Sequence, residues 1–526
     1  MTPRRRILLL VACCVVGVCV SAVFGNTFTA RHSSHAGFHH VRVADSVEPT
    51  DAPDELLRRP RRTAFVVFDG LGYLEASSMR SLSLLQAHGQ CRKTHVGSLS
   101  LSRPVYAVLS TGLEQDRTGA RGNDDITPLA AESVWEVARA AGLTVSAVSE
   151  LPWWRELFPD GFDKYLLAER ADNFFRLAPP ADIQIIHPLY VDETGHEHGA
   201  RSSQYQAAVT RADRELSEFL ATMDLSQDLV IVTADHGHSL RGGHGGQQDR
   251  VAHVLTCHAG LGVRHVAEEG ALRATTIGPS LALLLGLPFP ATMRAGDDDL
   301  DALWDIADPD AFPTRYLDRR RASVERFRAE NQDQLLAWLP ASQGSWDRFH
   351  ALSRRSQVLR ALPCLAVLIF VFAAQWRQNR RLSPSGSRRP ALFGVGFVLA
   401  ACLGIILLQT GLRGSFDLSS VAYREDFLQY TIAMALVWSG AAIGLHLLAR
   451  RGLAALMLDW SALSLVGTIV CLAHPLALGW QAGYPAPSPE VFFFPYFAAL
   501  VLGVQNGAGL VLAAITMILQ ARTRRG

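Results

Sequence analysis

One short stretch of the sequence, VIVTADHGHSLRGGHGG (230–246), carries a carboxylate and several imidazoles directly after an apolar run. Its first residues are β-branched and predict a buried strand. Asp235 and His236 follow this strand, and His244 comes after a glycine-rich turn. Carboxylate oxygens and imidazole nitrogens are good ligands for zinc and similar ions. Because a turn at a strand end lets these three side chains converge, the stretch predicts a metal site.

Two other apolar runs also end in aspartate. TAFVVFDGLGY (63–73) reaches Asp69, and ADIQIIHPLYVDETGH (181–196) reaches Asp192 and His196. The spacing of the last two residues lets a loop or a first helical turn bring both side chains to one ion. A strand-end aspartate can instead cap a helix, and a lone loop histidine is usually exposed to solvent. The joint pattern favours metal binding.

The elements that position these residues alternate along the chain. Strands are predicted in 63–73, 143–149, 181–196 and 228–237, and helical patterns lie between them, as in 131–142 and 203–223. This order predicts an α/β fold with a doubly wound, mostly parallel sheet. Ligands bind beyond the carboxyl ends of such strands. The three aspartates are therefore expected on one rim of the sheet.

A nucleophile is expected near the same rim. SLSLSRPVYAVLSTG (98–112) places several hydroxyl groups ahead of a proline. It can be read as a serine-rich turn that leads into a helix. It can also be read as a hydroxyl at a helix N-terminus, where free amides and the helix dipole favour anions. A bound metal ion would make such a hydroxyl a nucleophile at neutral pH.

Together these motifs resemble the alkaline phosphatase superfamily. Within it they are most similar to the nucleotide pyrophosphatase/phosphodiesterase branch and to the GPI ethanolamine-phosphate transferases. The resemblance covers about residues 63–296 and rests on VVFDGLG, SRPVYAVLSTG, HPLYVDETGHEHG, TADHGHSLRGGHGG and TTIGPSLALLLGLPFP. It implies an alkaline phosphatase-like fold, and two divalent metal ions, usually Zn²⁺, with Mn²⁺ as an alternative.

The resemblance also implies two sets of metal ligands. One ion would be held by Asp69, Ser102, Asp235 and His236. The other would be held by Asp192, His196 and His244. Three further histidines are interpreted as structural: His238, His253 and His258.

The nucleophile implied by the resemblance is Ser102, with Ser100 as the alternative because the serines lie so close together. Asn123 matches the phosphate-binding asparagine of the family. Arg103 is a candidate contact to a phosphate or a lipid headgroup, and His198 is expected to line the site. Sulfatases require an arginine four residues after the modified residue, and this chain has Tyr106 there, which speaks against a sulfatase.

The remaining apolar segments predict a membrane protein. RRRILLLVACCVVGVCVSAVFG (4–25) is read as an uncleaved signal anchor, with a cleaved signal peptide or a lipoprotein signal ending at Cys13 as alternatives. Five C-terminal spans are expected at about 359–376, 391–411, 427–449, 456–480 and 491–520. Basic connectors at 377–389, 449–452 and 521–526 place those ends and the N-terminus in the cytoplasm.

Four parts of the chain follow from this topology. They are an anchor (1–25), a tether (26–60), an extracytoplasmic catalytic domain (61–355) and a multi-pass membrane domain (356–526). The bacterial inner membrane is favoured, and the endoplasmic reticulum remains open. Inside the last part, Gln505 and Asn506 are read as making an interhelical hydrogen bond, or else holding a headgroup, and Asp459 is expected at a membrane edge. Pairing of Cys91 with Cys257 is left open.

The membrane spans favour a phospholipid or a lipid-linked glycan as substrate, whereas the formal net charge of +1 gives no reason to expect a nucleic-acid partner. The leading hypothesis is transfer of a phospho-group, phosphoethanolamine above all, through a phospho-serine. One alternative is a membrane-bound phosphodiesterase or phosphatase that uses water. A second is a catalytically inactive lipid- or glycan-binding protein.

Overall fold

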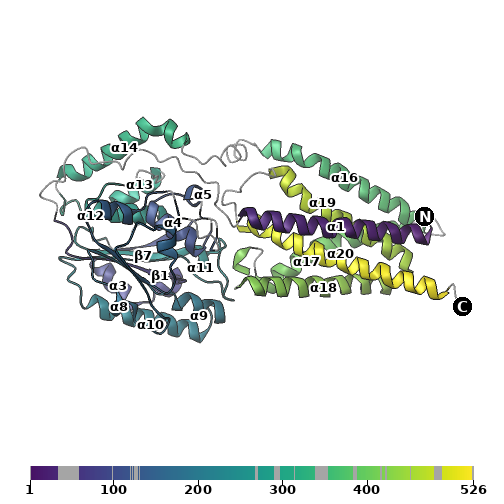
Figure 1. The fold of residues 1–526 in the computed structure, drawn as a ribbon, viewed down its shortest axis with the longest axis horizontal. Helices are drawn as coiled ribbons and strands as arrows, with labels where there is room; N and C mark the ends of the chain where they lie inside the picture. The colour runs from purple at the N-terminus through teal and green to yellow at the C-terminus, as the bar shows by residue number, and fades with distance from the viewer. Residues whose placement is uncertain are drawn as a thin grey trace.

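The computed structural model consists of an α/β domain and a long helical bundle that extends from it (Figure 1). It describes residues 2–32, 58–97, 99–118, 120, 122–123, 128–129, 131–266, 270–289, 297–312, 314–337, 354–382, 388–414, 417–420, 423–449, 452–478 and 489–523. Most of the tether expected at 26–60 lies outside these residues.

The centre of the α/β domain is an eight-stranded sheet with the order β4-β3-β5-β1-β6-β7-β2-β8. The strands are β1 (Thr63–Phe68), β2 (Gly89–His95), β3 (Val145–Ser149), β4 (Lys164–Leu167), β5 (Ile183–His187), β6 (Leu229–Ala234), β7 (His253–Gly260) and β8 (Leu272–Arg273). Neighbours from β4 to β6 are parallel, as predicted. β7 runs antiparallel to both β6 and β2, which the sequence did not indicate.

Helices cover both faces of the sheet, which confirms the doubly wound architecture (Figure 1). They are α2 (Tyr73–Ala76), α3 (Arg80–Ala87), α4 (Ser102–Thr111), α5 (Gln115–Thr118), α6 (Val134–Ala140), α7 (Trp153–Leu157), α8 (Phe174–Leu177), α9 (Tyr190–His198), α10 (Ser203–Leu220), α11 (Asp249–Ala252), α12 (Ile277–Leu285), α13 (Asp297–Trp304) and α14 (Thr314–Ala337). The patterns at 131–142 and 203–223 form α6 and α10. β1 and β6 are buried along their whole length because helices shield both faces.

The antiparallel pair formed by β2 and β7 carries a disulfide bond between Cys91 and Cys257. The two residues are direct cross-strand partners in the register of these strands. The sequence left this pairing open because the two cysteines are 166 residues apart in the chain.

The bundle consists of α1 (Pro3–His32), α16 (Arg354–Arg381), α17 (Arg389–Arg413), α18 (Arg424–Leu448), α19 (Gly452–Leu478) and α20 (Pro489–Thr523). Among the described residues, five segments are long and apolar enough to cross a membrane: Pro3–Asn26, Arg389–Arg413, Asp426–Leu448, Leu453–Ala473 and Tyr496–Arg522. The predicted span at 359–376 forms part of α16, which packs against α17 and α19 but is not one of the five.

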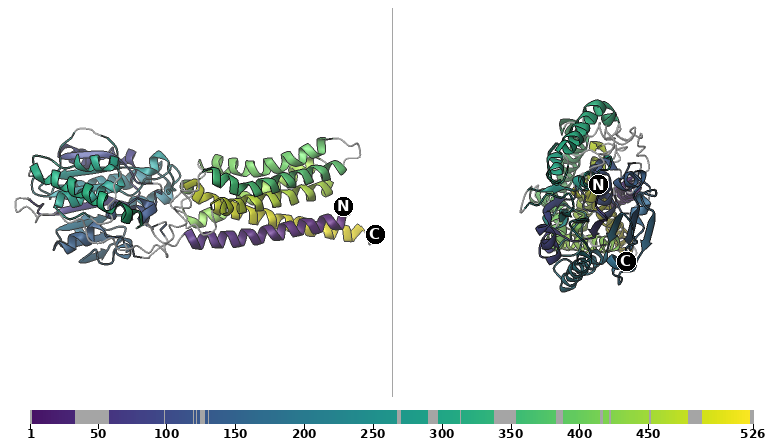
Figure 2. Two further views of the ribbon diagram at one scale, coloured as in Figure 1. Left: turned by 90° about the horizontal axis from the view of Figure 1, so that it is seen from above. Right: turned by 90° about the vertical axis from the view of Figure 1, so that its left-hand side faces the viewer.

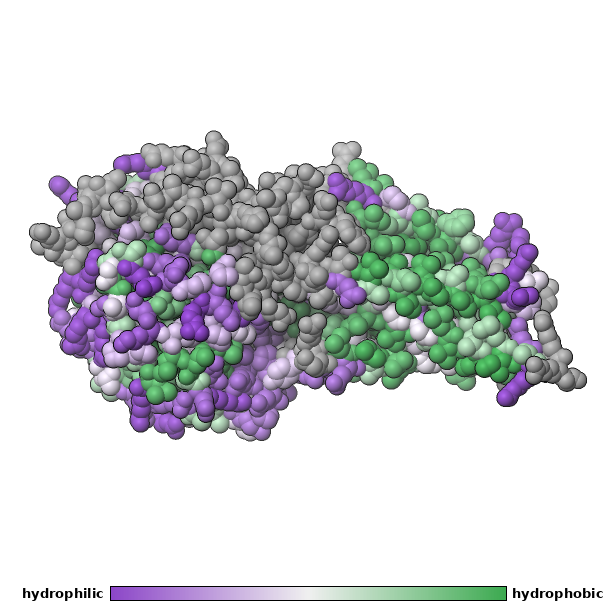
Figure 3. Space-filling view, in the orientation of Figure 1, coloured by the Kyte–Doolittle hydropathy of each residue, from purple (hydrophilic) through white to green (hydrophobic). Residues whose placement is uncertain are grey.

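Both chain termini lie at the end of the bundle that is remote from the α/β domain (Figures 1 and 2). Apolar residues predominate on the visible surface of the bundle, and polar residues predominate on the coloured part of the α/β domain and at that remote end (Figure 3). The chain therefore has an apolar zone between two polar ones, which is the distribution of a membrane protein.

Two polar clusters lie inside the bundle. Asn506 on α20 accepts a hydrogen bond from Ser464 on α19, which gives the expected interhelical contact. Asp459, which is expected at a membrane edge, lies on α19 inside the bundle. It is fully buried, 2.9 Å from Nε2 of His446 on α18, and it accepts hydrogen bonds from Gln375 at 2.9 Å and from Asn379 on α16. Helices α16 and α18 therefore supply the polar partners of this carboxylate.

Candidate active site

Two aspartates meet at the carboxyl ends of neighbouring strands. β1 and β6 are parallel and in register, with Phe68 beside Ala234, so the residues that follow them lie at the same edge. These residues are Asp69 and Asp235, and both are buried. Asp235 is fixed by two main-chain N–H groups, because its Oδ1 accepts from Gly70 at 3.1 Å and from His236 at 2.9 Å.

The first group of possible ligand atoms lies around the ring of His236. Its Nε2 is 3.4 Å from Oδ1 of Asp69 and 3.3 Å from Oδ2 of Asp235. The three ligand atoms lie within 4.8 Å of one another, which is close enough to hold one metal ion. Neither of these two carboxylate oxygens has a hydrogen-bond partner among the described residues.

A second group of ligand atoms is organised by α9. The helical spacing places Asp192 and His196 on one face, with Oδ2 of the carboxylate 3.4 Å from Nε2 of the imidazole. His244 reaches this pair from the glycine-rich turn, and its Nε2 lies 3.1 Å from Nε2 of His196. Two neighbouring nitrogens at this distance require a proton or a cation between them, since lone pairs repel each other.

Three histidines share an arrangement in which Nδ1 faces a main-chain carbonyl oxygen. His236 contacts Gly237 at 3.2 Å, His238 contacts Gly242 at 2.7 Å and His244 contacts Ser100 at 2.8 Å. A carbonyl oxygen only accepts hydrogen bonds, so each Nδ1 carries a proton. In the neutral ring the Nε2 lone pair then points into the cluster. Metal-binding histidines typically have such a partner on the second nitrogen.

The electrostatics of the cluster also fit a cation. Burial raises the pKa of Asp235, and the charges of Asp69 and Asp192 raise it further. Burial opposes charge on Asp192, but His196 and neighbouring rings lower its pKa well below the usual value. Burial and His196 lower the pKa of His244 to about 3. Three carboxyl groups crowded together in a buried cluster oppose one another's ionisation, and bound divalent ions would remove this penalty.

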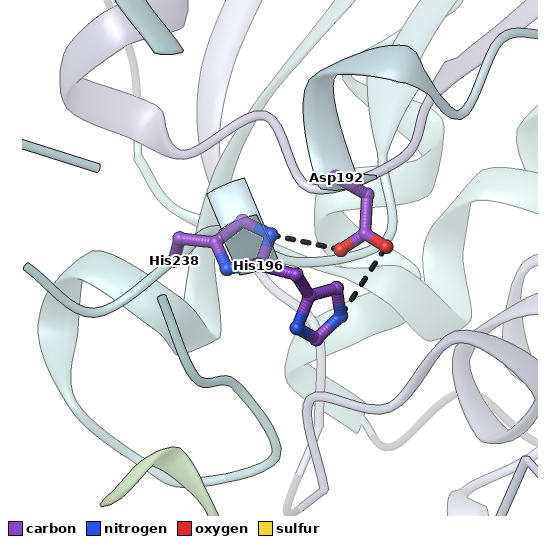
Figure 4. A group of neighbouring side chains, drawn as sticks. All are labelled: Asp192, His196 and His238. Carbon is purple, nitrogen blue, oxygen red and sulfur yellow. Dashed lines mark hydrogen bonds and ion pairs between the residues drawn. The ribbon is translucent and has the colours of Figure 1, made fainter. Parts of the chain in front are cut away.

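His238 belongs to this cluster, although sequence reasoning interpreted it as structural. Its Nε2 lies 2.8 Å from Oδ1 of Asp192, whose other oxygen faces His196 (Figure 4). These three residues form a further group that could hold a metal ion. The alternation Asp-His-Gly-His in the strand-end turn is the signal that could have revealed it, because residues two apart in an extended segment share a side.

The two candidate nucleophiles have different environments. Ser102 begins α4, and its Oγ lies 3.2 Å from Nε2 of His236. The Oγ of Ser100 donates to the carbonyl of Gly246 at 2.8 Å and accepts from the N–H of Gly245 at 2.9 Å. The hydroxyl of Ser100 thus holds the glycine turn, whereas the hydroxyl of Ser102 faces the ligand cluster.

Asn123 and Arg103 lie beside the start of α4. The side-chain oxygen of Asn123 accepts from the N–H of Arg103 at 3.1 Å, which places the amide next to Ser102. The guanidinium of Arg103 forms an ion pair with Glu156 and lies 4.7 Å from the ring centre of Trp153. This guanidinium is therefore already engaged within the protein.

Tyr106 is a site residue that sequence reasoning used only to argue against a sulfatase. It lies one turn after Ser102 on α4, and its hydroxyl donates to Oδ2 of Asp69. Its ring stacks on Trp154 with 4.5 Å between centroids, and its hydroxyl lies 3.0 Å from Nε2 of His187. These contacts orient the carboxylate of Asp69.

Three other histidines that the sequence singled out lie away from the ligand groups. The side chain of His198 is 40% exposed at the end of α9, where its Nε2 is 3.6 Å from Glu197. His253 pairs with Asp249 at 3.0 Å. His258 is buried and lies 2.8 Å from the hydroxyl of Ser280. The position of His198 on the outer surface of α9 gives no contact with the cluster.

Comparison with known proteins agrees with the resemblance seen in the motifs. Residues 146–272 match the family model "Type I phosphodiesterase / nucleotide pyrophosphatase". The catalytic subunit of mouse GPI ethanolamine phosphate transferase 3 is 25% identical over 233 residues, which are 41% of this chain and 21% of that protein. The fission yeast GPI ethanolamine phosphate transferase 3 is 32% identical over 114 residues, 21% of this chain and 12% of that protein. The matches thus span about a fifth or less of these relatives.

Solved structures also align with part of this chain. Murine ectonucleotide pyrophosphatase/phosphodiesterase 5 is 14% identical and aligns with 46% of this chain and 100% of that chain, with a TM-score of 0.39. The human protein of the same name is 12% identical and aligns with 46% of this chain and 99% of that chain, with a TM-score of 0.40.

Proposed function

We propose that this protein is a two-metal phosphotransferase that moves a phospho-group, phosphoethanolamine above all, from a membrane lipid through a phospho-serine on Ser102. The observation that carries the proposal is the position of this hydroxyl, at the start of a buried helix and 3.2 Å from a ring of the ligand cluster. The similarity to the GPI ethanolamine phosphate transferases supports the choice of headgroup.

The proposed ligand sets follow the two groups of side chains. One site comprises Asp69, Ser102, Asp235 and His236, and the other comprises Asp192, His196 and His244. His238 adjoins the second site through Asp192. Two divalent ions bound there, Zn²⁺ or alternatively Mn²⁺, would activate the nucleophile and stabilise charge on the reacting phosphate.

The chain's own residues supply the rest of the chemistry. Oγ of Ser102 forms a bond to phosphorus while the bond from phosphorus to the leaving lipid oxygen breaks, and that oxygen ends with the proton that the serine loses. The amide of Asn123 is placed beside Ser102 to donate to a phosphate oxygen. Tyr106 keeps Asp69 oriented throughout.

The acceptor completes the reaction. A hydroxyl of a lipid-linked glycan would displace the serine and take the phospho-group, which makes the protein a transferase. Water would make it a phosphodiesterase, and the match to a phosphodiesterase family model favours this second candidate. The complete set of carboxylates and imidazoles speaks against an inactive binding protein.

The proposed location is the extracytoplasmic side of the membrane. The disulfide bond between Cys91 and Cys257 supports this, because such bonds persist in oxidising compartments. The basic ends of α16 and α20 support it as well, since positive charge marks the cytoplasmic end of a span. This fits a bacterial inner membrane with a periplasmic catalytic domain, and also the lumen of the endoplasmic reticulum.

The test is a mass measurement on the acid-quenched, zinc-loaded protein after incubation with membrane phospholipids. A phosphoethanolamine adduct on the peptide that contains Ser102 is expected. A bare phosphate would show a monoesterase. An adduct on Ser100 would move the nucleophile by two residues. Purified protein that binds no divalent metal and forms no adduct would refute the enzyme hypothesis.

A further inference from the structure

The connector between α17 and α18, of which the structure describes residues 414, 417–420 and 423, contacts the glycine-rich turn of the candidate site. The hydroxyl of Ser419 accepts a hydrogen bond from the N–H of Gly246 at 2.8 Å. The guanidinium of Arg241 donates to the carbonyl of Leu412. These contacts join the membrane half of the chain to the turn that carries His244.

The fit between turn and connector depends on glycine. Gly245 has φ +106°, and a Cβ there would lie 2.8 Å from Cβ of Leu418. A Cβ at Gly246 would overlap Ser419 and Asp417. Any larger residue would push the turn and the connector apart, so the close approach of the two halves is built into the sequence of the turn.

Tyr423, at the end of the same connector, reaches the ligand cluster itself. Its ring stacks on His196, with 5.0 Å between centroids and 29° between planes. Tyr423 is 45% exposed, so its ring covers His196 from outside and remains accessible.

The position of Tyr423 along the chain places it next to the candidate membrane span of α18. The apolar span of α18 begins at Asp426, three residues later. At 1.5 Å per residue this is a rise of about 5 Å, within the thickness of a headgroup layer. Tyrosine favours this boundary because its ring is apolar and its hydroxyl is polar. A lipid phosphate at this height would lie beside His196 with its acyl chains still in the bilayer.

We propose that the connector forms the membrane-facing wall of the active site and that Tyr423 determines specificity by positioning the phosphodiester of a membrane lipid against His196. This inference rests on the proposed function and extends it to the membrane domain, whose connector completes the site. The residue positions substrate and takes no part in bond making.

The test compares two substrates, phosphatidylethanolamine in vesicles and the water-soluble diester bis(4-nitrophenyl) phosphate. Tyr423→Ala is expected to lower kcat/KM for the lipid by about tenfold or more, mainly through KM, as for loss of about 1.4 kcal/mol of binding. The soluble diester should react within about twofold of the wild-type rate, and the bound zinc should be unchanged. Tyr423→Phe, which keeps the ring, should resemble the wild type.

Two controls separate this role from others. Tyr430→Ala removes a ring that lies seven positions further along α18, where it contacts Arg413. This variant should change the rates on the two substrates by the same factor. A photoactivatable phosphatidylethanolamine should label the connector of chelator-treated wild type more strongly than that of Tyr423→Ala. This second readout needs no catalysis.

The outcomes are distinct. Equal loss on both substrates in Tyr423→Ala, or equal labelling of the two proteins, overturns the inference while lipid transfer stands. A wild type that cleaves the soluble diester but never the lipid overturns both the lipid donor and the inference. Activity of the wild type on neither substrate refutes the proposed function and the inference with it.

Discussion

Ser102→Ala and Ser100→Ala should have different consequences for the phospho-adduct and for stability, because the two hydroxyls make different contacts. The hydroxyl of Ser102 faces His236 at 3.2 Å, whereas that of Ser100 bridges Gly245 and Gly246. Ser102→Ala should abolish phospho-adduct formation and lower turnover by at least about 10³-fold, since removal of a covalent nucleophile costs about this much or more. Its effect on stability should stay near 1 kcal/mol.

The loss of stability expected for Ser100→Ala follows from the two main-chain groups that would lose their hydrogen-bond partner, the carbonyl of Gly246 and the N–H of Gly245. Each unsatisfied buried group costs about 1–3 kcal/mol, which gives roughly 2–6 kcal/mol for the pair. At about 2–4 °C per kcal/mol for a domain of this size, the melting temperature should fall by roughly 4–24 °C. The loosened turn also carries His244, so activity should fall as well, but the adduct should still form on Ser102.

The assay is a thermal melt of each purified variant together with acid-quenched mass spectrometry of the peptide that contains both serines. Ser102→Thr serves as the matched control, because it keeps a hydroxyl on the same carbon and should retain the adduct. An adduct that persists in Ser102→Ala, or that disappears in Ser100→Ala while the melting temperature is unchanged, would refute the assignment of the two roles.

Three further predictions follow from other contacts. His238→Gln should weaken binding of one zinc ion about 10–100-fold, because the ring orients Asp192, and zinc per chain after dialysis checks this; two ions still retained would contradict it. Glu150 has its pKa raised to about 7 by burial and Glu193, so its charged form destabilises the fold and stability falls as pH rises from about 4.5 to 7. Glu150→Gln should therefore raise the melting temperature of metal-free protein at pH 8 and leave it unchanged at pH 4.5; equal shifts at both values would refute the assignment. Asp459→Leu should destabilise the bundle by about 3–5 kcal/mol, and adding His446→Leu should restore part of this, because Gln375 and Asn379 still lose their acceptor; thermal aggregation in detergent measures both, and a double variant as unstable as the single one would contradict it.

Much of the catalytic fold could be predicted because its signals are local. The apolar runs that end in Asp69, Asp192 and Asp235 became β1, β5 with α9, and β6. The region between Asp192 and His196 formed a helix, so the four-residue spacing brought both side chains to one face. The reversal of β7 escaped prediction because strand direction depends on pairing with distant partners.

The chain by itself determined which residue types follow each strand, where the apolar helices lie and which motifs resemble known phosphotransfer enzymes, since these depend on neighbours a few positions apart. Only the tertiary structure decided that His238 joins Asp192, that Asp459 is buried against His446 and that Tyr423 covers His196. Tyr423 and His196 are separated by more than 200 positions in the sequence. Contacts of this kind arise from packing of whole elements, and no local pattern of residues encodes them.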